Sequence, residues 1–239
     1  MGLTSALDLS GTKWERYEQT VLVEHARANL RSGRIVAAPT DTVYGLLAMA
    51  SSSEAIDAVF QLKARPRERA LPVLVQGTSQ AIEACSVING RSKDRMEELA
   101  ELFWPGALTM VVSAEANPIT TNVSDGSSIA VRAPDDELLR SLLTAEPLVG
   151  TSANLHGQLP GSGGLEVVNG LMGESGRSLK YLYEIGLGLV IDGRPGGSQS
   201  STVVDLRGEL PVILRDGPIS SSDISDALRL PSRRRTESS

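Results

Sequence analysis

Residues 62–75 read LKARPRERALPVLV, a stretch that joins the end of a helix, a basic run and the start of a strand. Pro66 disfavours further helix, and the apolar run 71–75 predicts a strand. Between them, four cations stand against one acid, a net charge of +3 within seven residues: Lys63, Arg65, Arg67 and Arg69 against Glu68. Alternate side chains of an extended chain point the same way, so Lys63 and Arg65 can line one cavity wall. A solvated basic loop and an anion site are both open interpretations of this run alone.

On both sides of this stretch, helical and strand patterns alternate. Apolar residues at three-to-four spacing predict helices over residues 14–32, 51–66, 92–103 and 135–143, the second of them capped by Ser51 with Glu54. Short branched apolar runs predict strands over residues 34–38, 107–113, 128–132, 148–150, 189–192, 202–206 and 212–215. Together these elements predict an α/β or α+β fold with a sheet of about seven strands.

No linker or repeat divides the chain, so we expect one domain over residues 8–230 and a disordered polar tail at 231–239. Residues 156–164 and 193–201 are rich in Gly, Ser and Pro, which predicts surface loops. The glycines of 193–201 favour a segment that closes over a ligand as a lid.

The composition excludes several classes of protein. The 239 residues carry 23 basic and 29 acidic side chains, a net charge of −6, so bulk attraction to nucleic acid is not expected. One cysteine, Cys85, and two histidines, His25 and His156, leave no thiolate or imidazole metal site. No apolar run approaches the roughly 18 residues that cross a bilayer, and the N-terminus lacks a secretory signal, so we expect a soluble cytoplasmic protein.

Two further segments have the composition of binding loops. PLVGTSANLHG (147–157) places Ser152 and Asn154 just after a short apolar strand, where ligands bind in open α/β sheets; a simple capping turn is the alternative. IDGRPGGSQSSTVVDL (191–206) is a glycine-rich loop that leads into a strand at Ser201. The Gly-Lys-Ser/Thr phosphate loop, the GxGxxG fingerprint and the serine-hydrolase elbow are absent, so a phosphate site must be built differently.

The sequence resembles the Sua5/YrdC/TsaC family in the order and spacing of several motifs over roughly residues 20–220. These motifs are PTDTVYGL (39–46), KARPRERALPVLV (63–75), WPGALTMVV (104–112), SIAVRAP (128–134), PLVGTSANLHG (147–157), STVVDL (201–206) and ILRDG (213–217). The resemblance implies an α/β fold with a YrdC-like twisted mixed sheet, flanked by helices, and a large concave cationic cleft.

Members of that family join L-threonine, bicarbonate or CO2, and ATP into threonylcarbamoyl-AMP and pyrophosphate, for the t6A modification of tRNA. The resemblance therefore implies a nucleotidyltransferase with ATP as substrate, Mg2+ carried by the ATP phosphates and no metal held by the protein. It also implies a downstream threonylcarbamoyl transferase as partner, and leaves a weak contact with tRNA open. Three anionic reactants in one site require a cavity lined by cations.

By the same resemblance, Lys63 and Arg65 are the catalytic pair that contacts the ATP phosphates. The residues expected to bind the nucleotide are Lys63, Arg65, Arg69, Ser128, Ser152, Asn154 and Arg215. Those expected to bind threonine are Thr42, Tyr44, Arg132 and Ser201, with Arg132 pairing with the carboxylate and Tyr44 beside the side chain.

Two other functions stay open at this point. One is a YrdC-like module that makes carbamoyl-adenylate from carbamoyl phosphate; such modules usually belong to longer chains with a transferase domain. The other is a non-enzymatic RNA-binding module, against which the net charge of −6 argues.

Overall fold

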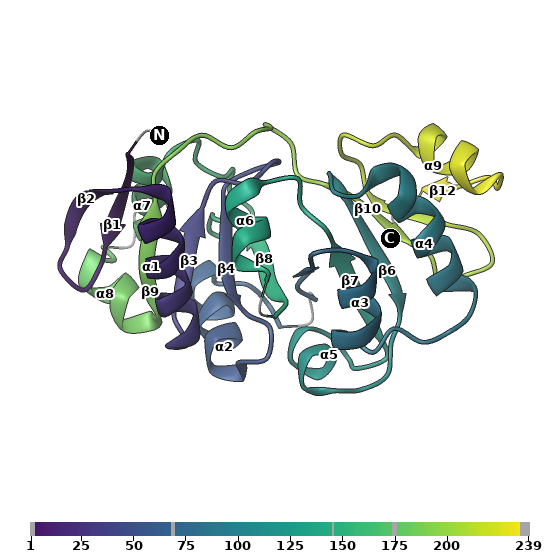
Figure 1. Ribbon diagram of the computed structural model, residues 1–239, viewed down its shortest axis with the longest axis horizontal. Coiled ribbons are helices and arrows are strands. Elements are labelled where there is room, and N and C mark those ends of the chain that lie inside the picture. The colour runs from purple at the N-terminus through teal and green to yellow at the C-terminus, as the bar shows by residue number, and fades with distance from the viewer. Residues whose placement is uncertain (1–2, 68–69, 145, 174–175, 235–239) are drawn as a thin grey trace.

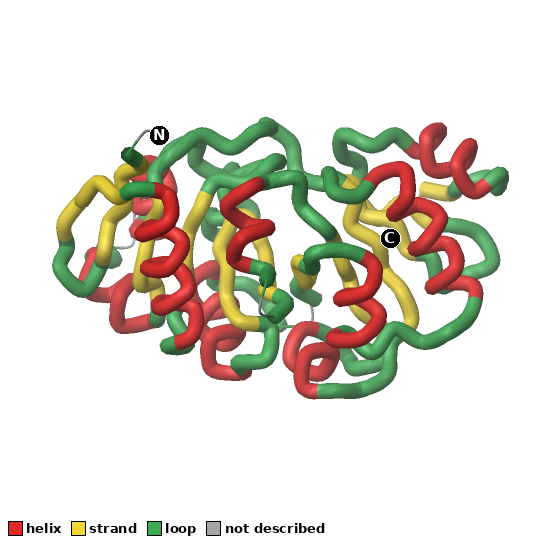
Figure 2. Tube along the Cα trace, viewed as in Figure 1, coloured by secondary structure: helices red, strands yellow, loops and turns green. Residues whose placement is uncertain are grey.

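The computed structural model describes residues 3–67, 70–144, 146–173 and 176–234. A twisted mixed sheet runs along the long axis of the molecule, with helices on both of its faces (Figure 1 and Figure 2). Its strands are β1 (Thr4–Asp8), β2 (Lys13–Tyr17), β3 (Ile35–Ala38), β4 (Gly45–Met49), β5 (Val73–Leu74), β6 (Leu108–Ser113), β7 (Ser128–Arg132), β8 (Leu148–Ser152), β9 (Leu187–Ile191), β10 (Thr202–Asp205), β11 (Val212–Arg215) and β12 (Arg233–Arg234). Across the sheet their order is β12-β11-β10-β6-β7-β5-β8-β4-β3-β9-β1-β2.

Helices connect these strands above and below the sheet. They are α1 (Gln19–Arg31), α2 (Ser53–Lys63), α3 (Thr78–Ala84), α4 (Arg91–Phe103), α5 (Pro118–Val123), α6 (Glu137–Leu142), α7 (Gly164–Met172), α8 (Leu179–Ile185) and α9 (Ser221–Leu228). None of the described helices is both long and apolar enough to span a bilayer.

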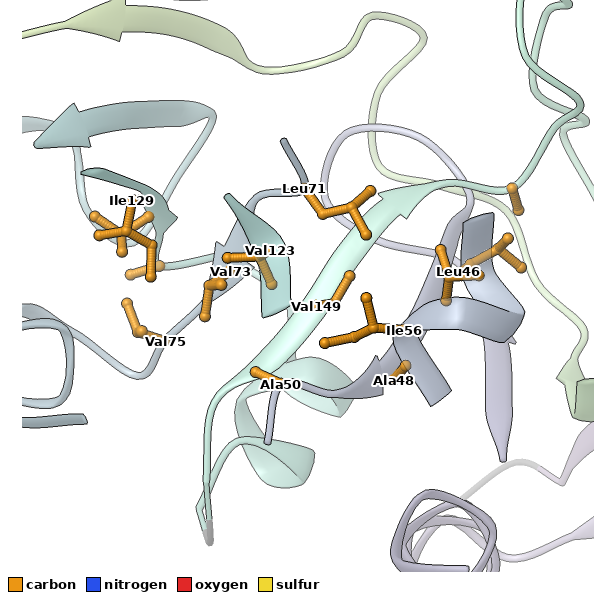
Figure 3. Close-up of a cluster of buried hydrophobic side chains, with 14 of the residues drawn as sticks. Leu46, Ala48, Ala50, Ile56, Leu71, Val73, Val75, Val123, Ile129 and Val149 are labelled. Atoms are coloured by element: carbon orange, nitrogen blue, oxygen red, sulfur yellow. The ribbon is translucent and has the colours of Figure 1, made fainter. Parts of the chain in front are cut away.

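Two apolar clusters form because successive strand residues point to opposite faces of a sheet. In β3, Ile35 and Ala37 belong to the cluster that contains the buried side chains of α2, whereas Val36 and Ala38 belong to the cluster that contains those of α1. Figure 3 shows part of the first cluster, where Ile56 of α2 lies beside strand residues such as Leu46. The second cluster also contains α6, and its face of the sheet carries the pocket described below.

Most predicted elements lie within one or two residues of an observed one, and the predicted strands 128–132 and 212–215 coincide with β7 and β11. The sheet has twelve strands rather than about seven. The prediction omitted four strands. The polar strand β2 forms a hairpin with β1, β4 closely follows a turn, and β12 is a two-residue strand at the sheet edge.

The predicted helix over 14–32 is wrong in its first part. Lys13–Tyr17 is strand β2, which pairs with β1 in register from Thr4 opposite Tyr17 to Asp8 opposite Lys13. The helix α1 begins only at Gln19, and its buried stripe is Leu22, Val23, Ala26 and Leu30. Strand pairing outcompeted the helical spacing of Trp14 and Tyr17, because those rings also fit a pleated surface.

The helix before the basic run has a different cap from the one predicted. Ser52, not Ser51, is the N-cap of α2, and its hydroxyl accepts a hydrogen bond from the Ala55 N–H at 3.2 Å. At the other end the chain leaves the helix through Ala64 in the left-handed region (φ 48°), and the Arg65 N–H donates to the Phe60 carbonyl at 3.0 Å. Beyond this turn, Arg67 lies back along α2, where it forms an ion pair with Asp57 and its guanidinium lies over the Phe60 ring.

The sheet extends beyond the expected limits of residues 8 and 230. Strand β1 begins at Thr4, and β12 at 233–234 pairs in parallel with β11. The expected disordered tail therefore starts with a short strand, and residues 235–239 lie outside the described part of the chain.

Candidate functional site

A pocket opens on the α1 and α6 face of the sheet, and strands β8, β5, β7, β6 and β11 each contribute residues to it. The space between its walls, part of which is open solvent, is about 690 Å³. Its lining residues are Thr40, Thr42, Val43, Gly45, Leu47, Arg65, Pro72, Leu74, Thr109, Arg132, Leu139, Gly150, Thr151, Ser152, Ser200, Ser201 and Arg215. Arginines and hydroxyls therefore share the pocket with an apolar wall.

Three guanidinium groups reach this pocket from parts of the chain that are far apart. Arg65 follows α2, Arg132 ends β7 and Arg215 ends β11. Burial lowers the pKa of Arg215, and the positive charges of Arg132 and Arg65 lower it further. Positive charges gathered in a concave site favour an anionic ligand.

Arg132 is held by hydrogen bonds from all three of its nitrogens. Nε donates to the Gly106 carbonyl at 2.9 Å, one terminal nitrogen donates to the Thr42 hydroxyl at 3.0 Å, and the other forms an ion pair with Asp41 at 2.5 Å. Burial lowers the pKa of Arg132, and the Asp41 carboxylate opposes that shift. The guanidinium is thus fixed and partly neutralised at the pocket wall.

Arg215 lies against the start of β10. Its Nε and one terminal nitrogen donate to the Ser201 carbonyl at 3.0 and 2.8 Å, and the same terminal nitrogen donates to the Ser201 hydroxyl at 3.0 Å. That hydroxyl also lies 2.8 Å from the hydroxyl of buried Thr109. Ser201 is therefore positioned by groups from β6 and β11 at once.

Lys63 lies beneath the end of β8 and not in the pocket wall. Its side chain is 1% exposed, and Nζ donates to the carbonyls of Ser152 and of Asn154, the latter at 2.7 Å. Burial, with a smaller effect from the Arg65 charge, lowers the pKa of Lys63 to about 7. The lysine thus holds the backbone of the segment that carries both residues.

That segment presents one side chain to the pocket and buries the other. Ser152 lines the pocket, whereas Asn154 is 8% exposed and its amide nitrogen donates to the Leu155 and Gln158 carbonyls, both at 2.7 Å. The Oδ1 atom of Asn154 has no hydrogen-bond partner among the described residues. Ser152 is therefore the residue of this segment that can contact a ligand in the pocket.

Four of the predicted site residues do not line the pocket: Lys63 and Asn154, as described above, and also Tyr44 and Ser128. Tyr44 is fully buried with its hydroxyl donating to the Ile191 carbonyl, because its side chain takes the α2 face while Val43 and Gly45 take the pocket face. Ser128 starts β7 and Arg132 ends it, so the two lie about 13 Å apart along the strand. Arg69 lies outside the described residues.

Sequence reasoning missed Asp41, which stands inside the PTDTVYGL motif beside Thr42. A carboxylate next to a predicted ligand of an arginine was the available signal. Leu47, Leu74 and Leu139 form an apolar wall of the pocket, and sequence reasoning missed Leu74 and Leu139, since these two read as ordinary core positions. Within the described ranges, no cluster of three His, Cys, Asp or Glu side chains could hold a metal ion.

Gly217 permits the close approach that positions Ser201. A Cβ at residue 217 would lie 2.2 Å from the Thr202 nitrogen and 2.6 Å from the Ser200 carbonyl oxygen, so Gly217→Ala must displace the start of β10. We expect a loss of about 1–3 kcal/mol in the free energy of unfolding, measured with denaturant. Gly170→Ala, in α7 where a Cβ meets nothing within 4 Å, is the control and should gain up to about 1 kcal/mol. Equal midpoints for the wild type and Gly217→Ala would contradict this packing.

The chain matches known proteins over most of its length. The Sua5/YciO/YrdC family model, described as "Telomere recombination", matches residues 28–217. Threonylcarbamoyl-AMP synthase of Bacillus subtilis is 31% identical over 84% of this chain and 55% of its own length. A relative from Mycobacterium leprae is 34% identical over 86% of this chain and 87% of its own length.

A solved structure shares the fold. Sua5 of Pyrococcus abyssi, crystallised with L-threonine, superposes with a TM-score of 0.76 at 28% identity, over 92% of this chain and 61% of that one. The chain thus spans little more than half of some relatives and most of others. With the family match over residues 28–217 and the shared fold, this chain belongs to the Sua5/YciO/YrdC family.

Proposed function

We propose that this chain is a threonylcarbamoyl-AMP synthase, which joins L-threonine, bicarbonate or CO2, and ATP and releases pyrophosphate. The observation that carries the proposal is the convergence of Arg65, Arg132 and Arg215 on one pocket with hydroxyl groups between them. ATP brings about four negative charges, and threonine and its carbamate bring carboxylates, so the reactants need such a cavity. The names of the relatives support the same activity.

In this proposal the pocket divides between nucleotide and amino acid. Arg65 and Arg215 contact the ATP phosphates, and Ser152 binds the nucleotide from β8. Asn154 is buried beside Ser152 and does not line the pocket, so it has no direct contact with the nucleotide in this proposal. Lys63 acts through the backbone it holds, since contact with a phosphate would break its hydrogen bonds to two carbonyls.

The amino-acid side of the pocket is formed by Thr42, Arg132 and Ser201. Arg132 takes the threonine carboxylate, because a guanidinium matches the geometry of a carboxylate. Tyr44 and Ser128 have no part in the proposal, since both lie away from the pocket. The expected role of Arg69 at the nucleotide stays a prediction.

The reaction requires positioning and charge compensation more than a covalent nucleophile. The threonine amine adds to CO2 to give a carbamate and a proton, and a carbamate oxygen then attacks the α-phosphorus of ATP as pyrophosphate leaves. The arginines would stabilise the charge that moves onto the leaving pyrophosphate. The apolar wall of Leu47, Leu74 and Leu139 would limit water near the carbamate.

Mg2+ would enter on the ATP phosphates. The residues that line the pocket carry arginine, hydroxyl and apolar groups, and none of them carries a carboxylate, the ligand that Mg2+ prefers. The product would pass to a threonylcarbamoyl transferase that modifies tRNA, and a cytoplasmic location would follow from that role.

Pyrophosphate release with ATP and bicarbonate, measured with and without L-threonine, tests the proposal. Strict dependence on threonine is the expected result. Dependence on carbamoyl phosphate would indicate a carbamoyl-adenylate module instead, and no turnover with either substrate would favour a binding module for RNA.

A further inference from the structure

Asp41 sits behind the pocket wall, in the turn before β4. Its side chain is 12% exposed, and one carboxylate oxygen pairs with Arg132 at 2.5 Å. The other oxygen accepts a hydrogen bond from the Asp135 N–H at 3.1 Å. Thr40 and Thr42, on either side of Asp41, line the pocket, but Asp41 does not. The carboxylate therefore acts on Arg132 from outside the pocket.

The contacts of Arg132 fix the plane of its guanidinium. A guanidinium has five N–H donors, and the bonds to Gly106, Thr42 and Asp41 use one on each nitrogen. One N–H therefore remains on each of the two terminal nitrogens. Two such donors held in a fixed plane can meet the two oxygens of one carboxylate.

The same ion pair distinguishes Arg132 from Arg215. Asp41 gives Arg132 a buried carboxylate partner, whereas the polar contacts found for Arg215 are the neutral carbonyl and hydroxyl of Ser201. A partly compensated cation suits a ligand with a single negative charge, and the less compensated Arg215 suits phosphates. Because of Asp41, the pocket near Arg132 thus prefers a ligand with one negative charge, whereas the pocket near Arg215 prefers phosphates.

We propose that Asp41 is a positioning residue that presents Arg132 to the carboxylate of the amino-acid substrate and makes the site select for that group. This inference rests on the proposed function. It adds a residue that touches no substrate but sets the affinity for one part of it.

The test compares L-threonine with L-threonine amide, which lacks the carboxylate charge, by calorimetric titration of the wild type and Asp41→Asn. The asparagine keeps the shape of the side chain but loses the charge. We expect the Kd for threonine to rise about tenfold or more, because Arg132 loses the ion pair that fixes its orientation toward the substrate carboxylate. The Kd values for threonine amide and for a non-hydrolysable ATP analogue should stay within about twofold, since neither depends on the carboxylate contact.

Asp205→Asn is the matched control, since Asp205 also pairs with an arginine, Arg207, at 2.7 Å, and neither of the two lines the pocket. This variant should bind threonine and threonine amide with the same Kd values as the wild type. If Asp41→Asn fails to fold, Asp41→Glu moves the charge by one methylene and should weaken threonine binding about threefold without affecting the amide.

The outcomes separate this inference from the proposed function. If the wild type binds threonine more tightly than its amide and the Asp41→Asn variant shows the same preference, the positioning role alone would be overturned. A wild type that binds neither ligand would overturn the proposed function.

Discussion

Replacing Arg132 with methionine is expected to lower threonine-dependent pyrophosphate release by roughly two to three powers of ten. The substitution keeps much of the side-chain volume but removes the proposed contact with the threonine carboxylate. It also leaves the buried Asp41 carboxylate without its cation. Breaking a buried ion pair on one side lowers the free energy of unfolding by about 3–5 kcal/mol, so stability should fall with activity.

The double variant Arg132→Met with Asp41→Asn separates these two effects. It should recover much of the lost stability, because no unpaired charge remains, but none of the activity. Arg207→Met, which breaks the pair with Asp205 outside the pocket, is the control for activity. Normal turnover by folded Arg132→Met would exclude Arg132 from the threonine site.

Replacing Lys63 with methionine is expected to have the second largest effect. The carbonyls of Ser152 and Asn154 lose their shared donor, and two buried acceptors left unsatisfied should lower the free energy of unfolding by about 2–5 kcal/mol. The segment from Ser152 to Asn154 would then no longer be held against the end of α2. The kcat/KM for ATP should fall by roughly two to three powers of ten, largely because ATP binds more weakly.

The pH dependence of that stability difference has a definite sign. Burial lowers the pKa of Lys63 from its ordinary value of 10.5 to about 7. Between these values the unfolded chain binds a proton that the folded chain does not, so the contribution of Lys63 to stability rises with pH. The cost of burying the charge is fully present below about pH 7 and is relieved as the pH increases.

Denaturant unfolding of the wild type and Lys63→Met between about pH 6 and pH 9 checks this sign. The stability advantage of the wild type should grow across the range. Lys180→Met, at an exposed lysine that lies 3.7 Å from Glu184, should show no such trend. A wild-type advantage that stays constant across the range would mean that Lys63 keeps its proton throughout.

Sequence patterns located most of the sheet because its central strands are apolar and short. They failed for the β1 and β2 hairpin, where KWERY carries a helical spacing and no apolar face. Only its pairing with β1 makes that segment a strand, and pairing between segments is not visible in local periodicity.

The same limit of local sequence patterns explains which of the predicted site residues the structure brings to the pocket. The motifs supplied Arg65, Arg132, Arg215 and Ser201, which converge on one pocket, because residue type indicates the chemistry of a contact. They could not assign Tyr44 to the core, since the choice between the two faces depends on how the turn before β4 enters the sheet. Nor could they show that Lys63 bonds to backbone carbonyls, which depends on how β8 lies over the end of α2.

A crystal structure with a non-hydrolysable ATP analogue and L-threonine bound together tests the central claim most directly. We predict both ligands in the pocket, with phosphate oxygens within hydrogen-bond distance of Arg65 and Arg215 and the threonine carboxylate on Arg132. Ligands bound on another surface, or a pocket still empty at saturating concentrations of both, would contradict the account.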